Sequence, residues 1–196
     1  MKEKILEWIW THQRHLLAGV GVSVGIVVLA IGALTWQNHR ENKAMAALNG
    51  AQGQLEALQK ITTDYPMTRA RRLAFWQWGD VALKAQKYEE ASGAYETLYK
   101  KAGEPLLRVV ALYGLAGVHQ EKKEFSQAAE IYSRAALEPG NLAAPYSDYL
   151  SARFWELAGD KEKAQGVYKK LSDNPDLPGD LKQTILDRQL WLAIQK

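Results

Sequence analysis

The sequence predicts an all-α protein in which a single N-terminal transmembrane helix precedes a solenoid of helix pairs. Three observations predict this fold class. A charge-free run of 21 residues, Leu16 to Trp36, lies near the start of the 196-residue chain. The rest of the chain carries apolar residues at helical spacing, with no alternating stretch that would indicate a strand. Helix-breaking Gly and Pro residues recur along it at regular intervals.

The composition excludes several classes of protein. The chain is 47% hydrophobic and 24% charged, which is ordinary for a folded protein and unlike a disordered or collagen-like chain. It contains no cysteine, so disulfides, thiolate zinc sites, iron–sulfur clusters and cysteine nucleophiles are excluded. The formal net charge of +3 is too small to indicate nucleic-acid binding, and no nucleic-acid partner is expected.

Residues 16–37 are the predicted transmembrane anchor. A helix of that length rises roughly 31 Å, close to the roughly 30 Å thickness of bilayer hydrocarbon. The apolar region of a cleaved signal peptide is shorter, about 7 to 15 residues, and a buried core helix is rarely apolar on every face. Trp8, Trp10 and Trp36 lie at or near the ends of the run, where indole prefers the membrane interface.

Two further features belong to this N-terminal region. Residues 1–15 alternate apolar and charged side chains, as expected for a cytosolic interfacial helix or for the first turns of the membrane helix itself. Gly21 and Gly25 form a small-xxx-small pair that would let a second membrane helix approach closely, giving a homo-oligomer. Glycine is also common in membrane helices without that role.

The flanking charges favour a cytosolic N-terminus. Lys2, Lys4 and Arg14 precede the run, and Arg40 and Lys43 follow it, which is a margin of one under the positive-inside rule. Long C-terminal domains cross membranes largely regardless of their charge. In a bacterium this topology gives a single-pass protein of the inner (cytoplasmic) membrane with its C-terminal domain in the periplasm.

Helices are predicted on both sides of the central region. Residues 38–64 are expected to form one amphipathic helix continuing from the membrane, because apolar residues recur at spacings of three and four until Tyr65-Pro66. Residues 177–196 are expected to form a capping helix over the last apolar face of the solenoid. Trp78, Trp155 and Trp191 are expected to pack the helix pairs and this cap.

Residues 65–176 contain an internal repeat. The segment KYEEA at 87–91 recurs as EFSQA at 124–128 and as DKEKA at 160–164, at offsets of 37 and 36 residues. Each block is predicted to be a helix, a tight turn and a second helix, whose alanine lies where two helices pass closely. Four residues after each alanine comes a tyrosine, which packs one turn further along the same face. The motif positions are filled by Phe75, Trp78, Gly79, Ala82, Ala91 and Tyr95, then by Leu112, Leu115, Ala116, His119, Ala128, Tyr132 and Pro139, and then by Ala164, Tyr168 and Pro175.

This pattern resembles the tetratricopeptide repeat, with its W-x2-L-G-x2-Y, A-x3-F and P positions. In the third repeat the register would place Asp148 and Ser151 at apolar positions. The layout, with a tryptophan-containing tail, a glycine-rich anchor ending in WQNH at 36–39 and three repeats, resembles the family of ancillary SecYEG translocon subunits. That resemblance implies a membrane-anchored periplasmic module for protein binding, with translocon subunits, periplasmic chaperones or secretory chains as partners. The YPMTRA junction at 65–70 is similar to joints of the Tol-Pal cell-division coordinators, so a cell-envelope or cell-division scaffold is the alternative.

No enzymatic activity, cofactor or metal site is expected. The chain lacks the GxSxG, GxxxxGK[ST] and HExxH motifs. Its histidines, His12, His15, His39 and His119, are scattered or flank the membrane. His119 occupies a first-helix core position and is expected to be a buried histidine with its hydrogen bonds satisfied.

The expected binding site is the concave groove of the solenoid, lined by the first helix of each repeat. Equivalent positions hold Trp76, Tyr113 and Tyr149, which would form an aromatic ladder of contacts with large area and low rotamer cost. Asp80 and Arg153, four residues further on, would add polar specificity. The alternative is that Trp76 packs against a neighbouring repeat.

A second candidate surface is the basic run from Arg69 to Arg72. It would meet anionic lipid or an acidic partner, although solvated arginine is the commoner outcome.

Overall fold

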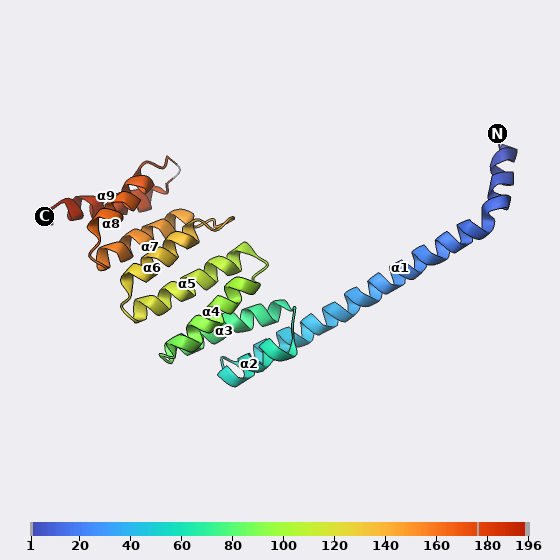
Figure 1. Ribbon diagram of the computed structural model, residues 1–196, viewed down its shortest axis with the longest axis horizontal. Helices are drawn as coiled ribbons and strands as arrows, with labels where there is room; N and C mark the ends of the chain where they lie inside the picture. The colour runs from blue at the N-terminus through green and yellow to red at the C-terminus, as the bar shows by residue number, and fades with distance from the viewer. Residues whose placement is uncertain (1, 176, 195–196) are drawn as a thin grey trace.

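The computed structural model describes residues 2–175 and 177–194, and the side chains of residues 11–12, 22–175 and 177–194. Within these ranges the chain forms helices and no strand, so the all-α prediction is confirmed (Figure 1). The nine described helices are α1 (Lys2–Ala51), α2 (Leu55–Asp64), α3 (Arg69–Lys84), α4 (Tyr88–Lys101), α5 (Pro105–Glu121), α6 (Phe125–Ala136), α7 (Ala144–Leu157), α8 (Lys161–Ser172) and α9 (Gly179–Ile194).

Most of α1 projects away from the other helices (Figure 1). Its part from Val22 to Ala51 is long and apolar enough to cross a membrane, and nothing in the rest of the chain covers its apolar window. Val24, Leu29 and Leu34 are accordingly exposed. Among the described residues this is the one candidate membrane-spanning helix, and it lies near the N-terminus as predicted.

The predicted single helix over residues 38–64 is wrong, because the chain reverses at Gln52-Gly53. Gln52 and Gly53 have φ of 47° and 76°, in the left-handed region, which a right-handed helix cannot contain. The reversal lays α2 back against the last turns of α1. Leu48, Leu58 and Ile61 are thereby buried in one cluster with the first turns of α3, so the end of α1 is part of the folded domain.

From α2 onward each helix packs against its neighbours in chain order, and successive helices run in alternate directions (Figure 1). The turns within the pairs α3–α4, α5–α6 and α7–α8 share one geometry. Each contains a left-handed residue, Gln86, Lys123 or Gly159, with φ of 58°, 59° and 82°. These three residues are 37 and 36 positions apart, so the backbone repeats with the period of the sequence.

The repeated side chains lie in the core. The alanines and tyrosines of the three motifs are all buried, and Tyr95 and Tyr168 are among the largest fully buried side chains. Gly79 on α3 and Gly114 on α5 both face the ring of Tyr95, and a Cβ on Gly79 would lie only 2.6 Å from it. Small residues therefore give three helices room around one ring.

The third pair departs from the expected register only at Asp148. Ser151 of α7 is fully buried, as that register requires, and Ser147 is buried as well, whereas the Asp148 carboxylate meets Lys170 Nζ at 2.9 Å. Trp155 is buried as expected.

The final helix covers the core with only one of its faces. Ile185 and Leu192 of α9 are buried, but Trp191 is 41% exposed, with Leu186 and Leu190 beside it on the outside. Trp191, which was expected to pack the helix pairs and this cap, therefore lies on the outer face of α9. Its ring instead lies under the guanidinium of Arg188, 4.4 Å from the ring centroid.

Candidate functional site

Trp76 is the exposed member of the predicted aromatic ladder. Its neighbours on α3 face inward: Phe75 is buried and stacks on Trp78, with ring centroids 5.9 Å apart. Trp76 lies on the other side of the helix and keeps 38% of its surface exposed. An indole in this position presents a large apolar face to a partner at little cost in rotamer entropy.

Asp80, one turn further along α3, is partly used by the fold. The Tyr95 hydroxyl donates a hydrogen bond of 2.5 Å to Asp80 Oδ1. Burial raises the pKa of Tyr95, and the bond to the carboxylate raises it further, so the phenol keeps its proton. Asp80 therefore helps to join α3 to α4, and it also lines a cleft on the surface.

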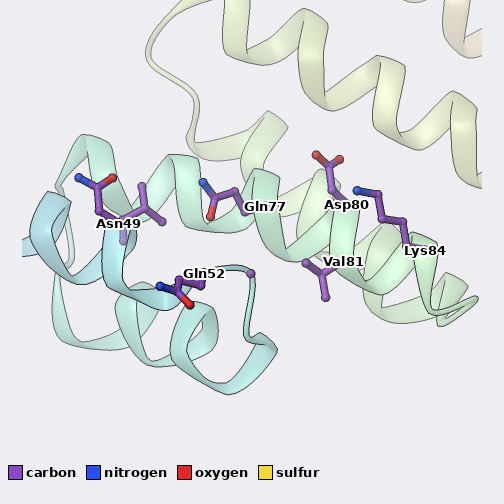
Figure 2. A pocket seen from close by; sticks show the side chains of 8 residues that line it. Asn49, Gln52, Gln77, Asp80, Val81 and Lys84 are labelled. Carbon is purple, nitrogen blue, oxygen red and sulfur yellow. The ribbon is translucent and has the colours of Figure 1, made fainter.

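That cleft lies between the end of α1 and α3 and has a volume of about 410 Å³ (Figure 2). Figure 2 shows Gln77, Asp80 and Lys84 in a row along one helix, with Asn49 and Gln52 across from them. Three amides, a carboxylate and an ammonium group thus surround one hollow, and its apolar wall comes from Leu48 and Val81. Amides both donate and accept hydrogen bonds, which suits the backbone of an extended peptide.

The sequence pattern did not identify the residues that α1 contributes to this cleft. Asn49 and Gln52 reach it because the chain reverses at Gly53 and lays the last turn of α1 beside α3. The α3 wall of the cleft could have been predicted, because Gln77 and Lys84 are polar residues two helical turns apart and therefore lie on one face of α3.

Tyr113 joins two helices. Its hydroxyl lies 2.7 Å from Ser147 Oγ on α7, and its ring meets the ring of Tyr132 edge-on with centroids 5.3 Å apart. Burial raises the pKa of Tyr113. The side chain is half-buried, so it offers a partner less surface than Trp76 does.

Tyr149 and Arg153 of α7 are also half-buried. The Tyr149 ring lies 6.1 Å from that of Tyr146 and 6.3 Å from that of Tyr168. Arg153 pairs with the nearly buried carboxylate of Glu156.

Glu156 is the centre of a charged cluster that joins three helices. Its carboxylate pairs with Arg153 of α7 and Arg188 of α9, and it accepts a hydrogen bond of 2.8 Å from the hydroxyl of Tyr168 on α8. Burial raises the pKa of Tyr168, and the bond to Glu156 raises it further. Glu156 thus joins α8 and α9 to α7, and Arg153 supports its charge from the same helix.

Within the described residues no group of three or more His, Asp or Glu could hold a metal ion. His119 is half-buried in the last turn of α5, not fully buried as expected, and its Nδ1 lies 2.6 Å from Glu124 Oε2. The hydrogen bond from His119 lowers the pKa of Glu124.

The predicted membrane contacts are placed in part. Gly25 is open, since a Cβ there would meet nothing within 4 Å. Trp36 is exposed at the end of the charge-free run, and the Arg40 guanidinium lies 5.3 Å from its ring centroid. Gly21, Trp8 and Trp10 lie outside the described side chains.

Comparisons with protein-family models, with curated proteins and with solved structures found no match.

Proposed function

We propose that this protein is a membrane-tethered protein–protein interaction module and an accessory factor of the Sec translocon. In this proposal its helix pairs form a tetratricopeptide-like solenoid in the periplasm, and α1 anchors the solenoid in the inner membrane. Its partners are translocon subunits, periplasmic chaperones or emerging secretory chains. The Sec assignment comes from the resemblance of the chain's layout to that family.

The solenoid part of the proposal is supported by the repetition of one backbone turn. Gln86, Lys123 and Gly159 take the same left-handed conformation at the same place in three successive helix pairs. Each turn is closed by the same backbone hydrogen bond, such as that from Lys87 N to Ala82 O at 2.9 Å. Identical units stacked on their neighbours are what defines a repeat protein.

The observation that carries the binding function is the exposed Trp76 on α3, one helical turn before Asp80, which lines the cleft between α1 and α3. Exposed aromatic residues next to hydrogen-bonding groups are typical anchors of protein interfaces. The indole would hold an apolar side chain of the partner, and Asn49, Gln52 and Gln77 would pair with its backbone. A secretory chain that emerges unfolded offers both groups.

Photocrosslinking from position 76 in cells, followed by mass spectrometry, tests the proposal. We expect adducts with translocon subunits, periplasmic chaperones or secretory chains. A photoreactive residue at Leu157, which is exposed on α7, is the matched control and should give few of these adducts. Adducts with Tol-Pal or cell-wall machinery would replace the Sec assignment by the scaffold alternative.

The substitution Trp76→Ala separates binding from folding. Because the side chain is only 38% exposed, its loss should lower the free energy of unfolding, by about 1 to 3 kcal/mol. Loss of an interface anchor should weaken partner capture about tenfold or more. A variant that is destabilised but captures every partner normally would show that Trp76 serves packing and not binding.

A further inference from the structure

The connections between helix pairs all lie toward one end of the domain. Because α2 runs back along α1, the loops at 65–68, 102–104 and 137–143 lie on the side that faces the projecting part of α1 (Figure 1). The turns between α3 and α4 and between α5 and α6 lie on the opposite side (Figure 1), and they contain Gln86 and Lys123. We call the three loops and the helix ends beside them the loop edge.

Glu41 sets the height of the loop edge along α1. Its carboxylate accepts hydrogen bonds from the backbone N–H groups of Arg69, at 2.9 Å, and Ala70, at 3.1 Å. The start of α3 is therefore level with residue 41, five residues beyond Trp36, or roughly 8 Å of helix rise. The headgroup region adds about 5 to 8 Å to each side of the hydrocarbon. If the charge-free run ends at the hydrocarbon boundary, the loop edge lies at the headgroups.

Exposed apolar side chains gather on this edge. Within residues 38–175 the four most exposed large apolar side chains are Met67, Leu106, Leu137 and Leu142, and all four belong to the loop edge. Met67 is 93% and Leu142 is 99% exposed, so neither side chain packs in the domain core. Packing of the domain therefore does not explain an apolar residue at either loop position. Met67 also has a φ of 66°, a left-handed conformation that is uncommon for a side chain of its size.

Basic side chains surround a small cavity beside Met67. The cavity has a volume of about 270 Å³, and its cationic lining consists of Arg71, Arg72 and Lys101. Arg72 has one acidic neighbour, Glu104, at 3.6 Å. The three cationic side chains that line the cavity suit the oxygens of a phosphate group.

We infer that the loop edge docks on the surface of the bilayer that α1 spans. Met67, Leu106, Leu137 and Leu142 enter the headgroup layer, and the cavity at Arg71, Arg72 and Lys101 holds the phosphate of an anionic phospholipid. This inference rests on the membrane anchoring in the proposed function. It means that the row of helix pairs lies along the membrane surface and does not stand away from it.

Lipid quenching of fluorescent labels tests the docking. The chain has no cysteine, so Met67→Cys and Leu142→Cys each give one labelling site in the full-length protein, reconstituted in vesicles containing phosphatidylglycerol. We expect nitroxide-bearing lipids to quench both labels strongly. Matched controls are Gln86→Cys and Lys123→Cys, which are exposed, left-handed turn positions at the opposite end and should be quenched little. Equal quenching at all four positions, or none at 67 and 142, would overturn the inference.

A label at position 29 distinguishes failure of docking from failure of anchoring. Leu29 is exposed within the candidate span, so a Leu29→Cys label should be quenched by nitroxides deep in the acyl chains. Quenching at 29 without quenching at 67 and 142 refutes the docking alone. Absence of quenching at 29 refutes the anchoring as well.

The phosphate contact is tested by charge. A basic residue near an anionic membrane surface contributes binding free energy. Arg71→Gln and Arg72→Gln should therefore each lower the ratio of docked to undocked protein about fivefold in phosphatidylglycerol vesicles. The same variants should have little effect in vesicles of phosphatidylcholine alone, and Lys123→Gln should have little effect in either. Equal docking in the two lipids, unchanged by the variants, would contradict the anionic site.

Discussion

The packing around Tyr95 depends on the absence of two side chains. Its ring fills the space next to Gly79 and Gly114, so neither position tolerates a Cβ without movement of a fully buried tyrosine. We predict that Gly114→Ala lowers the free energy of unfolding by about 1 to 3 kcal/mol, as overpacked cores do. Denaturation followed by circular dichroism in mild detergent would measure it.

Gly93 on α4 provides the control for this prediction. It is exposed, and a Cβ there would meet nothing within 4 Å. Gly93→Ala should therefore stabilise the domain by up to about 1 kcal/mol through helix propensity alone. Equal effects of the two substitutions would show that the space around Tyr95 is not limiting.

Glu138 gives the domain a pH-dependent contribution to stability. Burial alone would raise its pKa, but hydrogen bonds from Tyr99, at 2.7 Å, and Arg108, at 2.8 Å, with Arg134 nearby, hold that pKa below its usual 4.5. The charged form therefore stabilises the fold fully above pH 4.5, and this stabilisation is lost as the pH falls through the lowered value. Glu138→Gln should cost about 2 kcal/mol at pH 7 and much less near pH 3, measured by denaturation at both pH values.

The exposed Glu121 is the control for this residue. Glu121→Gln should change the unfolding free energy little at either pH. A cost of Glu138→Gln that is the same at both pH values would mean that the carboxylate acts through its shape and not its charge.

At the level of single residues, the sequence predicted the core better than the site. The repeated alanines and tyrosines are buried because short spacings within one helix pair fix them. Tyr113, Asp80 and Arg153 were predicted from register alone. Tyr113 and Asp80 contact other helices, through Ser147 and Tyr95, and no spacing within one helix reveals such contacts. Arg153 pairs with Glu156 of its own helix, and it is Glu156 that reaches Arg188 of α9.

Among the helices, the contact of α1 with α3 determines how the domain meets its candidate membrane helix. Glu41 of α1 accepts the first two backbone N–H groups of α3, where the helix dipole also favours its charge. We predict that Glu41→Ala costs about 1 to 2 kcal/mol of stability. The amides of Arg69 and Ala70 should also exchange hydrogen faster, as measured by mass spectrometry.

Thr68 and Glu56 make this test specific. Thr68 Oγ1 still accepts from Arg71 N at 3.1 Å, so α3 should remain helical in the variant. Glu56→Ala, in the exposed first turn of α2, should leave exchange at 69 and 70 unchanged. Unchanged exchange in Glu41→Ala would mean that Glu41 is not what joins the two helices.

Helix types were easier to predict than helix ends. Apolar spacing indicated a helix on both sides of Gly53. Apolar residues keep the spacing of three and four residues on both sides of the turn, so the pattern does not show that the chain reverses there. One helix was therefore predicted where two exist. The outer face of α9 shows a related limit. The apolar pattern identified the helix, but Leu190 and Trp191 are exposed because one neighbour, α8, buries only one of its faces.

In the molecule as a whole, the sequence predicted that a candidate membrane helix precedes the helix pairs, but it did not predict how the two lie relative to each other. The charge-free run predicted a candidate membrane helix. The direction in which the loop edge faces depends on the reversal at Gln52-Gly53, because that turn sends α2 back toward the projecting part of α1. A chain without the reversal would direct the same loops elsewhere.

The orientation of α1 in the membrane is the last prediction. Thr11 and Asn49 are both exposed and lie 38 residues apart in one helix, or roughly 57 Å of rise, more than the 40 to 45 Å of a bilayer with its headgroups. A membrane-impermeant maleimide should therefore label Asn49→Cys in intact cells and Thr11→Cys only after permeabilisation, if the N-terminus is cytosolic. The cysteine-free parent chain gives no background. The opposite pattern would reverse the orientation, and equal labelling of both positions in intact cells would show that α1 does not span the membrane.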